Sequence, residues 1–271
     1  MNVSQCLSRG QVLGLPRLES QLLLLHALGR PLHDRAWLLA HDTEALEPSL
    51  VSHFEGLVQR RLQHEPVAYI VGHKEFFGLR LQIDQRVLDP RDDTEVLVEW
   101  ALACAASFES PRFLDLGTGS GAIALALKSQ QVNASVTAVD ASLDALHVAQ
   151  HNAQSLSLDV AFIQSDWLKE VTGQFEVIVS NPPYIEANDP HLTLLQHEPQ
   201  EALVSGQDGL EDIRILIREA PKHLVQGGWL LIEHGWQQST QVRSLLMAAG
   251  YQQVQSKLDL AGIERCSGGH K

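Results

Sequence analysis

Short apolar runs alternate with amphipathic segments from about residue 112 onward. The apolar runs lie near 112–116, 135–139, 160–164, 175–180 and 228–233. Apolar residues recur at helical spacing near 121–129, 142–155, 209–223 and 237–249, and a further helix is expected from Asp93 to Ala106. Alternation of strand-like and helix-like segments is typical of an open parallel sheet covered by helices on both faces. We therefore predict an α/β fold for this part of the chain.

The first part of the chain has a helical pattern throughout. Its leucines recur at helical spacing at Leu18, Leu22, Leu25 and Leu28, and a second amphipathic segment covers 46–61. Residues 74–83 predict two short strands around Gly78, forming a hairpin or hinge. We expect a helical N-terminal domain at 1–72, a β-hairpin hinge at 73–90 and the main domain at 91–271.

Composition and charge narrow the class of protein. The net charge of −13 argues against holding nucleic acid by general electrostatics, although it leaves room for a local basic patch. No apolar run is long enough to cross a bilayer, and the N-terminus lacks the basic lead of a signal peptide. The cysteines Cys6, Cys104 and Cys266 are scattered, which indicates a reducing cytoplasm and no zinc site. We expect a cytoplasmic protein without a bound metal or a membrane partner.

The tetrapeptide Asn181-Pro182-Pro183-Tyr184 follows the apolar run 175–180. Its prolines remove two backbone donors and stiffen the loop, and the proline after Asn181 keeps that residue extended. The loop combines an amide, free carbonyl oxygens and an aromatic ring. This set suits a planar NH₂ group, because carbonyl oxygens accept its protons and the ring stacks on its face. We expect the loop to hold an amide or a base amine for reaction.

A glycine-rich turn follows the predicted strand 112–116. It consists of Gly117, Thr118, Gly119, Ser120 and Gly121. The spacing Gly-x-Gly-x-Gly differs from that of dinucleotide sites, and no Lys-Ser or Lys-Thr follows as in a P-loop, so we expect a ligand without a pyrophosphate. Asp140 ends the next strand, where an acid is placed to bind both ribose hydroxyls; a helix cap is its structural alternative.

Asp166 and Trp167 end the following predicted strand. Asp166 is placed to accept a hydrogen bond from an adenine amino group and Trp167 to cover the ring, while core packing explains Trp167 equally well. The glycine turn, Asp140 and the Asn181 loop all fall at the carboxyl ends of strands. Open α/β sheets bind their ligands at this edge, so we predict one site there.

Taken together, these motifs resemble those of class I S-adenosylmethionine-dependent methyltransferases. The chain is most similar to the PrmC/HemK family, the protein-(glutamine-N5) methyltransferases of peptide-chain release factors. The similar stretches cover nearly the whole chain: Glu75–Gly78, Pro90–Glu95, Asp115–Gly121, Ala138–Asp140, Ser165–Trp167, Val179–Ile185, Glu198–Leu203, Asp208–Leu210 and Ile232–Trp236. This ordered set is far more specific than any one of its motifs.

The resemblance implies a Rossmann-like sheet of seven strands whose last strand is antiparallel, in a methyltransferase domain at 91–271. It implies S-adenosylmethionine as cofactor, held at Gly117 to Gly121, Asp140, Trp167 and Asn181. It also implies that a substrate glutamine lies on Asn181 to Tyr184. That glutamine belongs to the Gly-Gly-Gln segment of a release factor, which we suspect docks on the helical domain at 1–72.

Some positions depart from the family pattern. Asp89 and Asp92 replace an apolar residue and a proline around Pro90-Arg91, and His197 replaces an aromatic residue before Glu198. The tail Cys266-Ser-Gly-Gly-His-Lys271 has the composition of a poor strand. We expect the last strand to be frayed and the central motifs to be intact.

The reaction depends chiefly on how the reacting atoms are positioned. A glutamine amide nitrogen is a poor nucleophile because its lone pair is delocalised into the carbonyl group, and the donor is already a charged sulfonium. The chain must therefore bring nitrogen, methyl carbon and sulfur into line. We hypothesise that the Asn181 side-chain oxygen and the Pro182 carbonyl accept the two amide protons, while Tyr184 packs on the amide plane. No general base is evident, so the proton is expected to leave to solvent.

Three other candidates have structural interpretations, which we favour for the first two. His147 and His151 stand one helical turn apart but lack a third metal ligand, which indicates a solvated helix face. Glu233-His234 is interpreted as a satisfied structural pair near the site. Glu198 either holds the loop after Tyr184 over the substrate or is a surface or capping carboxylate.

Two rival functions stay open on the sequence alone. The first is methylation of a nucleic-acid base, because methyltransferases that act on base amines also use an Asn-Pro-Pro-Tyr loop. The net charge of −13 and the lack of a basic recognition segment argue against this function. Within the glutamine class, a ribosomal protein is an alternative substrate. The second rival is an interaction protein that binds the cofactor but is inactive. The intact Asn181 to Tyr184 loop argues against it.

Overall fold

The computed structural model describes all 271 residues and divides into two compact units. One unit comprises Met1–His73 with Leu194–His197, and the other comprises Lys74–Thr193 with Glu198–Lys271. None of the helices has the length and apolar character that a membrane span requires.

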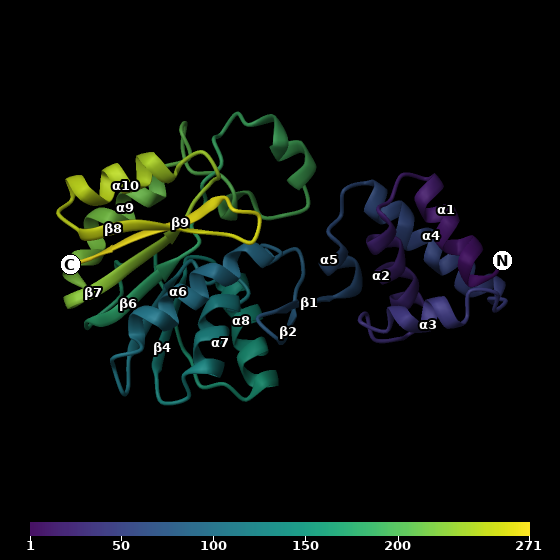
Figure 1. The fold of residues 1–271 in the computed structure, drawn as a ribbon, viewed down its shortest axis with the longest axis horizontal. Coiled ribbons are helices and arrows are strands. Elements are labelled where there is room, and N and C mark those ends of the chain that lie inside the picture. Colours follow the sequence, from purple (N-terminus) through teal and green to yellow (C-terminus); the bar gives the residue numbers. More distant parts are fainter. The chain divides into compact units, whose positions relative to one another are not determined.

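The first unit is helical. Its elements are α1 (Val3–Val12), α2 (Arg17–Ala27), α3 (Arg35–Ala40), α4 (Pro48–Leu62) and α5 (Val67–Val71) (Figure 1). Three consecutive leucines of α2, Leu23 to Leu25, are completely buried, whereas Leu18, the first of the leucines at helical spacing, is exposed. α2 packs against all four other helices of this unit, so its buried side chains are not confined to one narrow face.

The two strands predicted around Gly78 form a separate hairpin. They are β1 (His73–Phe76) and β2 (Leu79–Gln82), and the turn between them places Phe77 and Gly78 at positive φ. The Phe77 N–H donates to Glu95 Oε1 at 2.7 Å, which ties the turn to the helix that follows. The Gln82 N–H donates to Asn152 Oδ1 at 2.7 Å, so the hairpin is fixed to the second unit at both ends.

The second unit is built on a seven-stranded sheet of order β5-β4-β3-β6-β7-β9-β8. Its strands are β3 (Arg112–Leu116), β4 (Ser135–Asp140), β5 (Ala161–Gln164), β6 (Phe175–Ser180), β7 (Leu224–Glu233), β8 (Gln252–Leu258) and β9 (Glu264–His270). β3 to β7 are parallel, and β9 is antiparallel to both of its neighbours. The predicted seven-stranded α/β sheet with an antiparallel last strand is confirmed.

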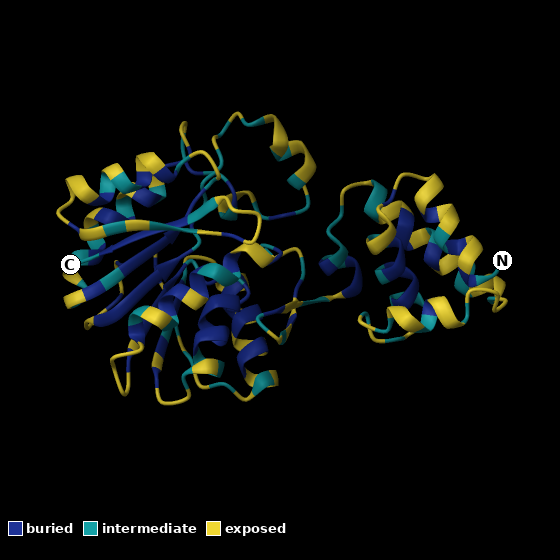
Figure 2. Cartoon of the chain, viewed as in Figure 1, coloured by how far each residue is buried: buried dark blue, intermediate teal, exposed yellow.

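Helices cover both faces of this sheet (Figure 1). They are α6 (Glu95–Ala105), α7 (Ala122–Gln130), α8 (Leu143–Leu156), α9 (Glu211–Glu219) and α10 (Ser239–Ala248), with a 3₁₀ turn at Asp92–Thr94 before α6. α9 and α10 bury one apolar cluster with sheet residues such as Leu116, Ile178 and Leu230. All six residues of β6 are buried, and Figure 2 shows the central strands in dark blue between partly exposed helices.

The last strand corrects a prediction from the sequence. β9 is seven residues long, is mostly buried and lies inside the sheet between β7 and β8. A Cβ on Gly268 would approach the Leu230 carbonyl oxygen to 2.5 Å, and one on Gly269 would approach Tyr251 Cβ to 3.0 Å. The strand was expected to fray because glycine is a poor strand former, but here only glycine fits between its neighbours.

Candidate active site

The site lies where the order of the parallel strands reverses, between β3 and β6. In open α/β sheets, a crevice opens at this switch point at the carboxyl ends of the strands. A cavity of about 670 Å³ is found there, within the second unit. Its lining includes Gly117, Gly119, Asp140, Asp166, Trp167, Asn181 and Pro183. The structure therefore brings together residues that the sequence placed on four separate loops.

The glycine turn takes a shape that only glycines adopt readily. Gly117, Gly119 and Gly121 have φ values of +75°, +54° and +84°. The N–H groups of Gly117 and Thr118 both donate to the Val139 carbonyl at 2.9 Å, which draws the turn onto the end of β4. A Cβ on Gly117 would lie 3.3 Å from the Trp167 ring, so a side chain at this position would press on that ring.

Asp115 supports the turn from below, a role that sequence reasoning missed. Its Oδ2 accepts hydrogen bonds from Thr118 Oγ1 at 2.6 Å and from the Ala124 N–H at 3.2 Å. Complete burial raises its pKa to about 7, and its Oδ1 has no partner. The signal was a carboxylate inside an otherwise apolar strand, where a buried acid needs a structural or functional reason.

Asp140 stands at the edge of the cavity and is held by backbone donors. Its Oδ2 accepts from the Gly119 N–H at 2.8 Å and its Oδ1 from the Ser142 N–H at 2.9 Å. Burial raises its pKa, and these backbone hydrogen bonds oppose the rise. The residue that caps α8 is Ser142, whose side chain accepts from the Ala145 N–H, so the cap does not account for Asp140.

Trp167 both packs on the core and lines the cavity, so its two interpretations from the sequence are compatible. Its ring contacts the apolar cluster beneath α9 and α10, and its indole N–H donates to Asp212 Oδ1 at 3.0 Å. Asp166 lines the cavity beside it and is exposed, with Oδ2 2.6 Å from the Lys169 ammonium.

Asn181 lines the cavity, and only one end of its side-chain amide is hydrogen-bonded within the chain. Asn181 Nδ2 donates to Thr94 Oγ1 at 3.3 Å, whereas no donor of the chain bonds to Asn181 Oδ1 or to the Pro182 carbonyl oxygen. Beneath the loop, Ser180 Oγ donates to the Leu116 carbonyl at 2.7 Å and joins the ends of β3 and β6. The loop therefore has two free acceptors on a fixed backbone.

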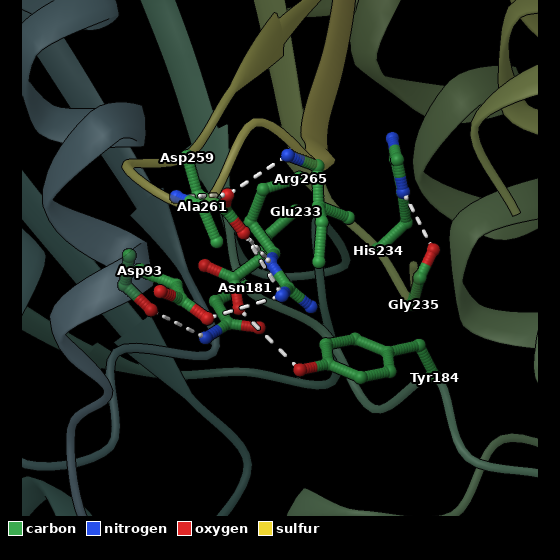
Figure 3. A network of polar contacts seen from close by, with 11 residues as sticks. Asp93, Asn181, Tyr184, Glu233, His234, Gly235, Asp259, Ala261 and Arg265 are labelled. Carbon is green, nitrogen blue, oxygen red and sulfur yellow. Dashed lines mark hydrogen bonds and ion pairs between the residues drawn. The ribbon is translucent and has the colours of Figure 1, made fainter. Parts of the chain in front are cut away.

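Tyr184 reaches a buried carboxyl group at the end of β7. Its hydroxyl donates to Glu233 Oε1 at 3.5 Å, and burial raises the pKa of this hydroxyl. Burial also raises the pKa of Glu233 to about 7, although the Arg265 guanidinium opposes the rise. Figure 3 shows Asn181, Tyr184 and Glu233 around this point, with Arg265 paired to Asp93 at 3.1 Å and to Asp259 at 3.0 Å.

Glu233 and His234 do not form the structural pair that the sequence suggested. His234 bonds Ser267 Oγ through Nε2 at 2.8 Å and the Gly235 carbonyl through Nδ1 at 3.0 Å. Glu233 turns the other way, toward Tyr184, and its Oε2 has no partner. Adjacent residues of an extended chain point to opposite sides, which is why the two side chains part.

Glu198 is not the surface carboxylate of one sequence-based interpretation. Its side chain is buried, its Oε1 lies 2.5 Å from Arg91 Nη2, and its Oε2 accepts from the Asp89 N–H at 3.3 Å. Pro199, Glu201 and Ala202, which follow it, line the cavity. The ion pair therefore fixes the start of a segment that forms one cavity wall.

Five of the expected site residues do not line the cavity. Thr118 turns down to Asp115, and Ser120 is buried, with its carbonyl accepting from Asn152 Nδ2 at 2.9 Å. Gly121 is the N-cap of α7, Pro182 is buried in its loop, and Tyr184 faces Glu233. These residues support the glycine turn and the Asn181 loop without lining the cavity.

The cavity fits S-adenosylmethionine, the cofactor that the resemblance implies. Its volume falls within the range of about 300–1,000 Å³ that is usual for small-molecule sites. Its lining carries the carboxyl groups of Asp140, Asp144, Asp166, Glu201 and Asp212 against one guanidinium, that of Arg86. This balance favours a ligand with net positive charge, such as a sulfonium.

Comparison with known proteins agrees with this geometry. The "Methyltransferase small domain" family matches residues 92–257, and the "PrmC N-terminal domain" family matches residues 2–72. A release factor glutamine methyltransferase of Bordetella pertussis is 47% identical, over 95% of this chain and 96% of its own. One of Coxiella burnetii is 42% identical, over 97% and 94% of the two chains.

A solved structure of a methyltransferase from Pyrococcus furiosus has the same fold. It aligns with a TM-score of 0.55 at 20% identity, over 79% of this chain and 96% of its own. At the sequence level, the two relatives align over nearly their whole length with this chain. The chain therefore belongs to the release factor glutamine methyltransferase family.

Proposed function

We propose that this protein transfers the methyl group of S-adenosylmethionine to the side-chain amide nitrogen, N5, of the glutamine in the Gly-Gly-Gln segment of a peptide-chain release factor. One observation carries this proposal beyond family membership. Asn181 lines the cavity and ties its own amide NH₂ to Thr94, while two oxygen acceptors, its Oδ1 and the carbonyl of the adjacent Pro182, have no donor within the chain. Two acceptors on a rigid loop match the two protons of a primary amide.

The cofactor is proposed to lie in the cavity between the glycine turn and Trp167. Gly117 and Gly119 let the backbone approach it closely, and Asp140 is placed to accept from the ribose hydroxyls. Asp166 and Trp167 are assigned to the adenine ring, Asp166 as acceptor and Trp167 as cover. When bound, S-adenosylmethionine supplies a methyl group on a positively charged sulfur, a leaving group that needs no further activation.

The substrate amide is proposed to lie on Asn181, Pro182, Pro183 and Tyr184. Hydrogen bonds to the Asn181 oxygen and the Pro182 carbonyl orient the nitrogen and stabilise the positive charge that develops on it. Pro183 lines the cavity and closes the space beside the nitrogen. Tyr184 limits rotation of the amide plane. The proton of the methylated amide is lost to water, because a protonated amide nitrogen is strongly acidic and needs no general base.

The direct test uses labelled S-adenosylmethionine, the purified protein and a bacterial release factor. A second release factor carries alanine in place of the Gly-Gly-Gln glutamine. Label on the first protein and none on the second is the expected result. Label on ribosomal protein, DNA or RNA with none on the release factor would overturn the substrate assignment, and cofactor binding without turnover on any of these would support an inactive interaction protein.

We also propose that the helical part of the chain, predicted at 1–72, docks the release factor. Leu18 and Leu39 are large apolar side chains exposed on this unit. Replacing both with glutamate should raise the KM for release factor and leave the affinity for S-adenosylmethionine unchanged. Val132, an exposed apolar residue of the second unit, gives the matched control in Val132→Glu. Equal KM values for all three proteins would contradict the docking role.

A further inference from the structure

Two polar residues behind the Asn181 loop have no part in the mechanism above. Thr94 ends the 3₁₀ turn before α6, and Glu233 ends β7. Both are buried, and they come from segments that lie far from Asn181 in the sequence. Their hydrogen bonds nevertheless converge on the two side chains that the substrate amide would meet, those of Asn181 and Tyr184.

The donors and acceptors in this group fix a direction. Asn181 Nδ2 donates to Thr94 Oγ1, so the single hydroxyl proton of Thr94 must go to another acceptor. The Glu233 carboxyl group is buried, and the Thr94 side chain lowers its pKa as a donor would, which makes Glu233 the acceptor for that proton. The order is therefore Asn181 to Thr94 to Glu233, with each group donating to the next.

This order determines which end of the Asn181 amide faces the cavity. With the NH₂ group on Thr94, the oxygen is left for the substrate. If the amide turned over, it would present a donor to the donor NH₂ of a glutamine, and Thr94 would lose its incoming hydrogen bond. The carboxyl group of Glu233 also accepts from the Tyr184 hydroxyl at 3.5 Å (Figure 3).

We propose that Thr94 and Glu233 are positioning residues that orient the Asn181 amide and the Tyr184 ring for the substrate amide. The inference rests on the proposed function in that it takes the Asn181 loop as the place where the substrate amide binds. It adds two residues that touch neither substrate nor cofactor and act through Asn181 and Tyr184.

The central test compares Thr94→Val, which keeps the shape and removes the hydroxyl, with Thr94→Ser, which keeps the hydroxyl. Leaving a buried donor without its acceptor costs about 1–3 kcal/mol, so Thr94→Val should lower kcat roughly tenfold to hundredfold. Thr94→Ser should restore most of that loss. The Kd for S-adenosylmethionine, measured by calorimetry, should be the same in all three proteins, which a general disturbance of the fold would not allow.

Glu233 offers a second matched pair. Glu233→Met keeps the volume and removes the acceptor, whereas Glu233→Gln keeps one oxygen. Because Oε2 has no partner, that one oxygen can still serve both hydroxyls. We expect the methionine variant to lose kcat as Thr94→Val does and the glutamine variant to retain more. Equal kcat values for the two variants of either pair would overturn the proposal.

A measurement without turnover separates this inference from the proposed function. The side-chain NH₂ signal of Asn181, assigned by its loss in Asn181→Ala, reports hydrogen exchange with water in nuclear magnetic resonance. Exchange should be slow in the wild type and Thr94→Ser, and roughly tenfold faster in Thr94→Val, in line with the loss of one hydrogen bond. Unchanged exchange in Thr94→Val would overturn this proposal even if the release factor is the substrate. Faster exchange supports the proposal even if the substrate is another protein.

Discussion

The glycine turn after β3 and the Asn181 loop after β6 meet at one cavity but are fixed by different means. The turn is shaped by its own backbone, through three positive φ angles and hydrogen bonds to the adjacent end of β4. In the Asn181 loop, Asn181 is hydrogen-bonded to Thr94 and Tyr184 to Glu233, which belong to distant segments. Changes in the turn should therefore alter cofactor binding, and changes behind the Asn181 loop should alter turnover.

The largest effect is expected at Asn181. Asn181→Ala removes the acceptor that orients the substrate amide, so kcat should fall about 10²-fold or more, as for the loss of one preorganised polar group. Steady-state kinetics with labelled S-adenosylmethionine measures the change. The variant should keep the wild-type unfolding midpoint, and near-normal turnover would refute the assignment of this residue.

A smaller effect should separate two glycines of the turn. Both Gly117→Ala and Gly119→Ala place a Cβ at positive φ, which costs about 1–2 kcal/mol. Only the Cβ on Gly117 meets the Trp167 ring, at 3.3 Å, whereas nothing lies within 4 Å of one on Gly119. Calorimetry should show a weaker affinity for S-adenosylmethionine in Gly117→Ala than in Gly119→Ala. Equal affinities would mean that the Trp167 ring does not bound the cofactor site.

The last effect concerns stability against pH and isolates Glu233. Its pKa is about 7 in the folded protein against an ordinary value of 4.5, because burial outweighs Arg265 and the hydrogen bonds from Thr94 and Tyr184, while Asp93 adds to the rise. Between these two values the folded protein keeps a proton that the unfolded chain has lost. The free energy of unfolding should therefore fall as pH rises through this window, by about 1.4 kcal/mol for each unit of pKa separation.

Glu233→Gln removes this titration and should flatten the slope. Asp115, whose pKa is also raised to about 7, is present in both proteins and cancels in the comparison. Urea unfolding at about pH 5 and about pH 8 gives the four free energies that are needed. Identical slopes for the wild type and the variant would show that Glu233 titrates in its ordinary range.

The fold was largely predictable because its signals are local. The alternation of strands and helices and the hairpin around Gly78 follow from short-range patterns, and the structure has them. The wrong prediction concerns the last strand, whose state is decided by its neighbours. β9 forms because glycines fit where larger residues would not.

The residues of the site were likewise predictable where their signals are local, and their partners were not. The glycine turn, Asp140 and Asn181 stand at strand ends that sequence motifs reveal, and the structure brings them to one cavity. The partners of these residues were not predictable, because hydrogen bonds such as Asn181 to Thr94 join positions 87 residues apart. Strand alternation separates the side chains of Glu233 and His234, whereas the partners that each one meets depend on strand register, which the sequence does not reveal.

The most direct test of this account is tandem mass spectrometry of a release factor after incubation with S-adenosylmethionine and either the wild-type protein or Asn181→Ala. The account predicts a methyl group on the side-chain nitrogen of the Gly-Gly-Gln glutamine with the wild type and almost none with the variant. A methyl group on another residue, or equal modification of that glutamine by both proteins, would contradict it.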